Sequence, residues 1–398
     1  MRGLKFRSIS CLVGAEIAVM SLWFISAAIL PDMVREVPIT AARQAFLSSA
    51  VQAGFVAGAM TFAIWGIADR FDPRRVFALC SFTAALINAA LLVLPVGGAL
   101  AIAGRFATGA LLAGVYPVGM KIAVGWGTAD RGFLVGLLVG ALTLGSASPH
   151  LAALLGGADW RSAVIATSAA AAAGGLMVLA TGLGPHHARA AAFDPRAILI
   201  AWTDRRIRLA YAGYLGPMWE LYAMWAWIGL AAAVSYSATM AADAAGDFAK
   251  LTAFLAIGLG GIASIVAGLV ADRIGKAEIA IIAMAASGTA ALATAASFGG
   301  PAWLTFVLIL VWGTAIVPDS AQFSALVADA APPEQAGSLL SLQTALGFTL
   351  TAFTVQLTPV LAERFGWPAL MAGLAVGPAY GIVAMMRLRR IGGQRASS

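Results

Sequence analysis

The 398-residue chain is 61% hydrophobic and only 11% charged, and its formal net charge is +7. Soluble domains carry about a quarter of charged residues. The composition therefore excludes a soluble globular protein and indicates that lipid is the solvent. In such a chain the positive charge does not indicate nucleic-acid binding, because its distribution between loops reports membrane topology instead.

Long apolar runs predict twelve membrane-spanning helices, because a helix needs about 20 mostly apolar residues to cross a bilayer. The first run is too long for the apolar core of a signal peptide, so we interpret it as the first span. The expected fold class is an all-α integral membrane protein. The expected spans are 9–30, 45–68, 75–95, 99–126, 132–156, 161–183, 208–234, 248–271, 277–298, 302–327, 336–360 and 367–387.

The distribution of basic residues predicts the orientation. Of the 25 lysines and arginines, 18 fall in segments on the N-terminal side of the predicted membrane and 5 on the opposite side. Basic residues accumulate in cytoplasmic loops. We therefore expect a multi-pass protein of the inner or plasma membrane with both termini in the cytoplasm.

Two charged segments show that the chain repeats. An Asp-Arg pair followed by basic residues closes the second predicted span at Asp69-Arg70 and the eighth at Asp272-Arg273. Such an internal repeat is typical of transporters built from two parallel halves. We expect halves at residues 1–183 and 208–398, joined by a cytoplasmic linker at 184–207.

Local turn signals support this division. Asp72 followed by Pro73 predicts the start of the third span, because aspartate caps helices and proline suits the first helical position. Val115-Tyr116-Pro117 in the fourth span matches Ile316-Val317-Pro318 in the tenth. Phe193-Asp194-Pro195 predicts a short surface helix in the linker.

Two six-helix halves with an Asp-Arg pair after the second helix of each resemble the major facilitator superfamily. The family pattern is Gly-x-Leu-Ala-Asp-Arg-x-Gly followed by two basic residues. The first copy departs from it, with Trp65 at the first glycine position and Asp72-Pro73 in place of the second glycine and first basic residue. The second copy fits it at Gly268, Asp272, Arg273, Gly275 and Lys276.

Two further segments, Arg105-x-x-x-Gly109 and Asp159-Trp160-Arg161, also resemble family motifs. The resemblance implies a secondary transporter whose spans 1, 4, 7 and 10 line a central cavity. It also implies that Asp69 and Asp272 cap helix N-termini across the interface of the halves and so bias a conformational switch. The residues expected to act in this switch are Asp69, Arg70, Arg74, Arg75, Gly268, Asp272, Arg273 and Lys276.

Charged residues inside predicted spans are candidates for function, because each costs at least about 2.5–3.5 kcal/mol at the bilayer centre. Five clear cases, Glu16, Arg105, Lys121, Glu220 and Asp319, all fall on spans 1, 4, 7 and 10. Aromatic and amide residues near them complete the expected cavity. The expected substrate and proton site comprises Glu16, Trp23, Arg105, Tyr116, Lys121, Trp219, Glu220, Trp227, Asp319 and Gln322.

The helical positions of these residues suggest roles. Arg105 and Lys121 lie about 160° apart on an ideal helix, so both face the cavity only if Pro117 kinks or unwinds the fourth span. Lys121 either pairs with Glu16 or extends to the cytoplasmic surface. Glu220 lies near mid-span among aromatic residues, and we expect it to carry the coupled proton, with Asp319 as the substitute.

The sequence thus predicts a proton-coupled secondary transporter that works by alternating access. When ionised, the cavity residues hold three carboxylates against two cations. Protonation of one carboxylate makes the set neutral, so that a small anion can bind at Arg105 in symport with protons. The alternative is proton-antiport efflux of aromatic or cationic compounds, and a non-transporting sensor or scaffold is the alternative from another class. We expect a monomer that meets its substrate, protons and membrane lipid, with no cofactor, no metal and no enzymatic motif.

Overall fold

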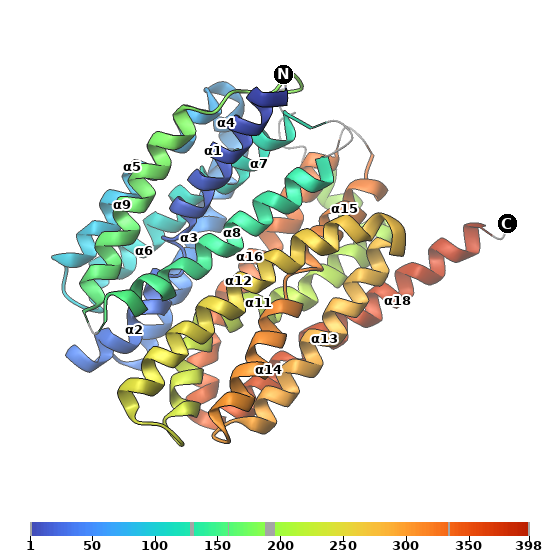
Figure 1. Ribbon diagram of the computed structural model, residues 1–398. Coiled ribbons are helices and arrows are strands. Elements are labelled where there is room, and N and C mark those ends of the chain that lie inside the picture. Colours follow the sequence, from blue (N-terminus) through green and yellow to red (C-terminus); the bar gives the residue numbers. More distant parts are fainter. Residues whose placement is uncertain (1, 128–130, 158, 188–195, 333–334, 397–398) are drawn as a thin grey trace.

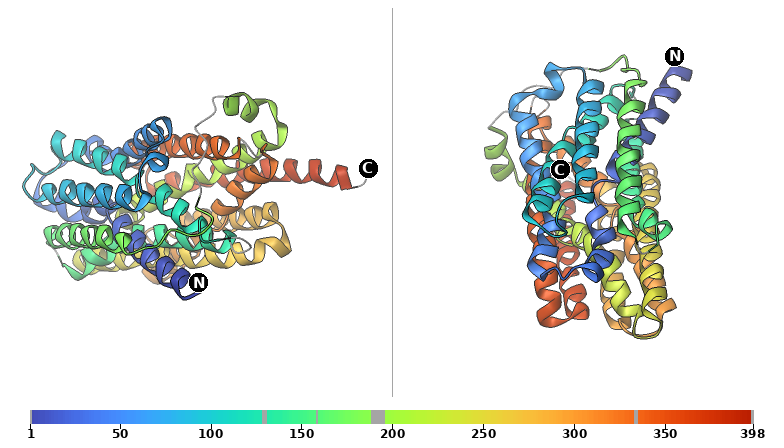
Figure 2. Two further views of the ribbon diagram at one scale, coloured as in Figure 1. Left: turned by 90° about the horizontal axis from the view of Figure 1, so that it is seen from above. Right: turned by 90° about the vertical axis from the view of Figure 1, so that its left-hand side faces the viewer.

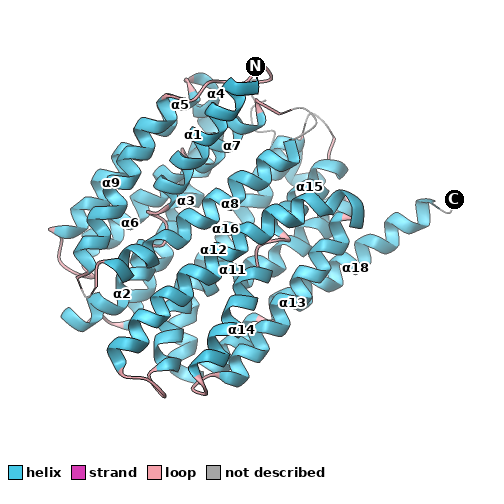
Figure 3. Ribbon diagram, in the orientation of Figure 1, coloured by secondary structure: helices cyan, strands magenta, loops and turns pink. Residues whose placement is uncertain are grey.

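The computed structural model describes residues 2–127, 131–157, 159–187, 196–332 and 335–396. Throughout these residues the regular elements are helices joined by short loops (Figure 3). The first bundle comprises α1 (Arg2–Met20), α2 (Ile25–Glu36), α3 (Ala41–Trp65), α4 (Ile67–Arg70), α5 (Pro73–Ala89), a 3-10 turn (Ala90–Leu92), α6 (Ala99–Leu112), α7 (Tyr116–Val124), α8 (Arg131–Leu155) and α9 (Trp160–Leu179).

A second bundle follows a connection that contains the short helix α10 (Arg196–Thr203), where a surface helix was expected, although 193–195 lie outside the described residues. The second bundle comprises α11 (Arg205–Tyr236), α12 (Ala242–Ile274), α13 (Lys276–Ser297), α14 (Ala302–Ala315), α15 (Ser320–Ala330), α16 (Ala336–Phe365), α17 (Trp367–Leu374) and α18 (Val376–Ala396).

The two bundles lie side by side and meet along two seams (Figures 1 and 2). Within the first bundle α3 packs on α6 and α5 on α9, and within the second α11 packs on α18 and α13 on α14. Across the bundles α8 packs along α12, and α3 packs along α16. Both termini lie at one end of the molecule, which we call the termini end; the opposite end, which carries the loops after α2, α8 and α11, is the distal end.

The predicted twelve-span, all-α fold is confirmed. Within the described residues, 11 segments are long and apolar enough to cross a membrane by length and composition. The twelfth is α11, whose 32 residues are ample in length. Its tyrosines, tryptophans, Pro217 and Glu220 keep it out of that set of 11 segments. The composition of α11 therefore sets this span apart from them.

Four spans are interrupted among the described residues. The first is interrupted at residues 21–24, the fourth at 113–115, the tenth at 316–319 and the twelfth at Ala375. The break in the fourth span lies just before Pro117 and fits the expected kink. Its counterpart in the tenth span contains Pro318 and Asp319. The break in the first span was not expected, because no proline or glycine marks it in the sequence.

Glycine allows the closest helix approach in the first bundle. A Cβ atom built on Gly109 of α6 would collide with the carbonyl oxygen of Val51 in α3. A Cβ built on Gly58 of α3 would likewise collide with the carbonyl oxygen of Ala110. The backbones of α3 and α6 are therefore in contact. This is common in membranes, where helices associate through close packing at small residues and not through the hydrophobic effect.

We expect Gly109→Ala to destabilise the protein, because backbone atoms must move to admit the methyl group. Overpacking of this kind costs about 1–3 kcal/mol. The matched control is Gly373→Ala in α17, where the added atom would meet nothing within 4 Å and where alanine favours the helix. Thermal unfolding in detergent measures both, and an unchanged or higher midpoint for Gly109→Ala would contradict the packing.

Candidate functional site

Arg105 is bonded to the backbone at the break in the first span. Its Nη2 donates to the carbonyl oxygens of Leu22 and Trp23, each at 2.7 Å. A broken helix leaves carbonyl groups without intrahelical donors, and in a bilayer water does not replace them. The guanidinium group, which is only 1% exposed, therefore supplies the hydrogen bonds that the interrupted helix lacks.

A polar chain extends from Arg105 through the first bundle. Nη1 of Arg105 donates to Oδ1 of Asn88 at 3.3 Å, and Nδ2 of Asn88 donates to Oγ of Ser168 at 2.9 Å. These contacts join α1, α5, α6 and α9. Arg105 is thus engaged inside the first bundle rather than presented to a substrate, which differs from the predicted anion-binding role.

The break places Trp23 and Phe24 at the meeting point of the bundles. We call the cluster of Trp23, Phe24, Phe55, Tyr222, Trp225 and Phe348 the aromatic layer. Ring centroids of Trp23 lie 5.5 Å from Phe348 and 5.8 Å from Tyr222. Phe55 and Phe348 approach to 4.6 Å. The first three residues belong to the first bundle and the others to the second, so this layer closes the centre of the molecule.

Two indole N–H groups in the aromatic layer donate no hydrogen bond to the described residues. Nε1 of Trp23 and Nε1 of Trp225 are buried, and neither has a hydrogen-bond partner among the described residues. A buried donor without a partner costs about 1–3 kcal/mol. Two such donors in one central cluster indicate a place where a polar ligand would be bound.

Glu16 lies on α1, toward the termini end from the aromatic layer. Its side chain is fully buried, and in the described part of the chain neither carboxyl oxygen has a hydrogen-bond partner. A Cβ built on Gly119 of α7 would lie 2.5 Å from Oε2 of Glu16. The glycine therefore makes the space that the carboxyl group occupies. Tyr116, at the start of α7, lies within electrostatic reach of Glu16.

Glu220 has a different environment from Glu16. Its Oε1 accepts a hydrogen bond from Nε1 of Trp312 at 2.6 Å, and its Oε2 accepts one from Oγ of Ser287 at 3.1 Å. The partners lie on α14 and α13, so Glu220 is held inside the second bundle. Both oxygens are satisfied by neutral donors, and the carboxyl group is fully buried.

The remaining predicted cavity residues are dispersed. Asp319 is 1% exposed at the break between α14 and α15, and it accepts a hydrogen bond from Oγ of Ser320 at 3.3 Å. Gln322 follows it and is 3% exposed. Lys121 is partly exposed on α7.

Two predicted tryptophans lie away from the aromatic layer. Trp219 donates from Nε1 to the carbonyl oxygen of Gly373 in α17 at 3.2 Å. Trp227 donates to the carbonyl oxygen of Val355 in α16 at 3.0 Å. Both therefore anchor helices of the second bundle, because the residues between them on α11, Tyr222 and Trp225, take the central face.

The predicted switch segments lie at the termini end. In the first, Asp72 caps α5 and pairs with Arg74 at 2.7 Å, and the hydrogen bond from the Arg74 side chain lowers the pKa of the Asp72 carboxyl. Arg74 also donates to the carbonyl oxygen of Thr181 at 3.2 Å. In the second, Lys276 pairs with Asp329 at 2.6 Å. Each pair lies within a single bundle.

Other residues of the switch segments make fewer contacts. Arg70, Arg75 and Arg273 are exposed, and a Cβ on Gly268 would meet nothing within 4 Å. The side chains of Asp69 and Asp272 lie outside the described part of the structure. The capping role expected for these two aspartates therefore stays a prediction.

Sequence reasoning missed several residues of the site. Phe55 and Phe348 each lie in an apolar span that contains other aromatic residues, so nothing in their surroundings distinguishes them from packing residues. Asn88 is an amide in the middle of a predicted span, and this polarity was a usable signal.

The motif Asp159-Trp160-Arg161 holds Glu36, because Arg161 binds its carboxylate at 2.6 and 2.9 Å.

We expect Arg105→Ala to lower stability by about 2 kcal/mol or more, because each buried carbonyl left without a donor costs about 1–3 kcal/mol. The matched control is Arg364→Ala at the exposed end of α16, where the guanidinium lies 5.4 Å from the ring of Phe365 and such a contact is worth only about 0.5–1 kcal/mol. Thermal unfolding in detergent compares the two variants. Equal midpoints would contradict the role of Arg105 at the break.

Comparisons with known proteins agree with this architecture. The structure is similar to the xylose transporter XylE from E. coli in a partially occluded inward-open conformation, with a TM-score of 0.73, 12% identity and coverage of 98% of each chain. It is similar to a D-xylose-proton symporter, with a TM-score of 0.73, 13% identity and coverage of 96% of each chain. A variant of the nucleoside transporter NupG gives a TM-score of 0.73 and 13% identity, over 97% of this chain and 99% of that one.

These identities are low, so the similarity shows a shared fold. A search of curated proteins gave no match. The model of the Major Facilitator Superfamily matches residues 12–355, which is most of the chain. The protein therefore belongs to the major facilitator superfamily of membrane transporters.

Proposed function

We propose that the protein is a proton-coupled secondary transporter that carries an uncharged, hydroxyl-bearing solute through the aromatic layer by alternating access. Family membership supports transport. The contact of six aromatic residues from both bundles supports a central binding place that opens when the bundles separate. The basic loops support an orientation with both termini in the cytoplasm.

The aromatic layer supports an uncharged substrate. Flat aromatic faces stack on rings, and the unpartnered Nε1 groups of Trp23 and Trp225 donate to hydroxyl or carbonyl oxygens. The expectation of an anion depended on Arg105, whose Nη2 already binds two backbone carbonyls. The xylose and nucleoside transporters of similar fold carry substrates of the proposed class.

Glu16 is the proposed proton carrier. An ionised carboxyl group buried without a partner costs several kcal/mol, and Glu16 is buried with both oxygens unpartnered among the described residues. Its ionisation then depends on whether water reaches it, which changes as the bundles move. Glu220 is less suited to this role, because Trp312 and Ser287 hold both of its oxygens within one bundle.

The substrate class is tested by thermal shift of the purified protein with D-xylose, uridine, lactate and tetraphenylphosphonium. Ligand binding to the folded state raises the unfolding midpoint. We expect a shift with D-xylose or uridine that is lost in Trp23→Phe, which keeps an aromatic ring and removes the donor. A shift with lactate alone would restore the anion hypothesis. A shift with tetraphenylphosphonium alone would support efflux of cationic compounds.

Proton coupling is tested in proteoliposomes with a pH-sensitive dye inside, using whichever probe binds. We expect Glu16→Gln to abolish probe-driven proton movement while probe exchange continues, because the amide occupies the same space without titrating. Glu220→Gln is the matched amide variant, and we expect it to keep proton movement. Loss of proton movement in Glu220→Gln but not in Glu16→Gln would assign the role to Glu220 instead.

A further inference from the structure

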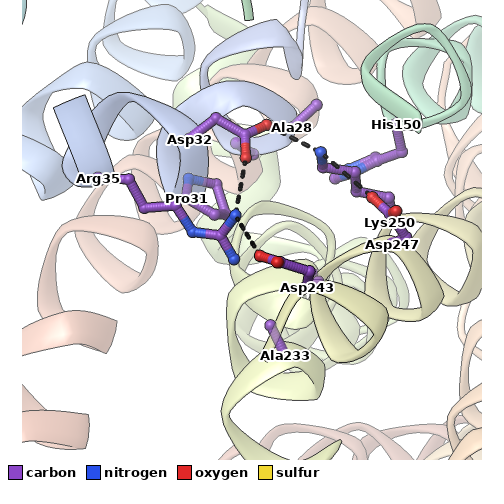
Figure 4. Close-up of a pocket in the computed structure, with 12 residues that line it drawn as sticks. Ala28, Pro31, Asp32, Arg35, His150, Ala233, Asp243, Asp247 and Lys250 are labelled. Carbon is purple, nitrogen blue, oxygen red and sulfur yellow. Dashed lines mark ion pairs between the residues drawn. The ribbon is translucent and has the colours of Figure 1, made fainter. Parts of the chain in front are cut away.

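An ion pair joins the two bundles at the distal end. Asp32 lies on α2 of the first bundle and Lys250 on α12 of the second, and their side chains point toward each other (Figure 4). Nζ of Lys250 lies 2.9 Å from Oδ2 of Asp32. The two side chains are only 8% (Lys250) and 3% (Asp32) exposed. Lys250 is one of the five basic residues expected on the outer side of the membrane, and Asp32 follows the first expected span, so neither is among the predicted site residues.

Further contacts surround this pair. Lys250 also donates to the carbonyl oxygen of Gly157 in the first bundle at 3.3 Å. Arg35 lies 3.8 Å from Asp32 and 3.6 Å from Asp243 of the second bundle. Asp32, Arg35, Asp243, Lys250 and His150 line a small cavity of about 110 Å³. Gly157 follows α8, so the contacts of Lys250 with Asp32 and with Gly157 break if α12 moves away from both α2 and the end of α8.

Burial distinguishes the two cross-bundle pairs. Asp243 is 97% exposed and Arg35 50%, and exposed pairs contribute little because water screens them. Breaking the Asp32–Lys250 pair without hydration would leave each buried charge with only one longer contact among the described charged residues, Asp32 with Arg35 and Lys250 with Asp247, each at 3.8 Å. Loss of the close partner of a buried charge is strongly unfavourable. The pair can therefore break only as water enters, and opening of the distal end is what admits water.

The termini end lacks an equivalent within the described residues. The ion pairs there, Arg74–Asp72, Lys276–Asp329 and Arg389–Glu278, each join residues of a single bundle. The ion pairs that cross between bundles in the described part of the chain are all at the distal end.

We propose that the Asp32–Lys250 pair is a latch that holds the distal end closed and must break each time this end opens. The latch depends on the proposed function only in that the two bundles move against each other. It is independent of the substrate and of the residue that carries the proton.

The test uses a reporter cysteine behind the latch. Ala28 lines the same cavity and is 1% exposed, so A28C is protected while the distal end is closed. Cys11 and Cys80 are first replaced. We expect Asp32→Asn and Lys250→Met each to raise the rate of A28C labelling by a membrane-impermeant maleimide about tenfold, equivalent to about 1.4 kcal/mol in the closed-to-open equilibrium. The double exchange D32K/K250D restores the attraction and should return the rate toward that of the parent.

The matched control is Glu36→Gln, which breaks a pair of 2.6 Å with Arg161 at the same end but within the first bundle. We expect it to leave A28C labelling unchanged. Unchanged labelling in both Asp32→Asn and Lys250→Met, or an equal rise in Glu36→Gln, would overturn the latch. If the single variants do not fold, the double exchange decides: slow labelling supports the latch, and fast labelling overturns it.

Proteoliposome flux separates this outcome from that of the proposed function. Normal flux in the parent together with unchanged labelling in the latch variants contradicts the latch alone. Absent flux in the parent with raised labelling in the variants supports the latch and contradicts transport of the probe.

Discussion

The hydrogen bonds from Arg105 to the carbonyl oxygens of Leu22 and Trp23 are the interaction on which the centre of the structure depends. A span that breaks in a bilayer exposes backbone groups that lipid cannot satisfy. The guanidinium group satisfies two of them and is itself held by Asn88. The break then turns Trp23 and Phe24 toward the second bundle, and the aromatic layer forms there. The sequence predicts that Arg105 binds an anionic substrate. In the structure Arg105 instead shapes the aromatic layer, where the substrate is proposed to bind.

The structure has three levels along its length. The distal end has the buried Asp32–Lys250 pair, the centre has the aromatic layer, and the side toward the termini has the buried carboxyl of Glu16. Both the distal pair and the aromatic layer consist of residues from opposite bundles. Any rocking of the bundles about their seams must therefore separate these contacts, whereas Glu220 and Arg105 move with their own bundle.

The fold followed from the sequence because long apolar runs and loop charges are strong signals in a membrane protein. Pro117 also marked the fourth span as one that could kink or unwind, since proline is tolerated at the start of a helix but not in its interior. The break at residues 21–24 left no such mark, because it is stabilised by Arg105 from another helix. Long-range partners of this kind are not encoded in local spacing.

The roles of individual charges were harder to predict for the same reason. Mid-span position singled out Glu16, Arg105 and Glu220 as candidates, and all three side chains are buried. Position could not tell that Trp312 satisfies Glu220 while Glu16 has no partner in the described residues. Asp32 and Lys250 were missed because each lies near the end of a span, where a charge is ordinarily hydrated and only the facing partner reveals its burial.

The most direct test of this account is a pair of spin-label distances that report both ends of the molecule together. Labels at Val37 and Thr239 report the distal end, and labels at Phe71 and Ile274 report the termini end; all four side chains are exposed. Double electron–electron resonance then compares the parent with Asp32→Asn. The account predicts that the variant lengthens the distal distance and shortens the distance at the termini end. Lengthening of both distances, or of neither, would contradict a single rocking motion of two bundles about the aromatic layer.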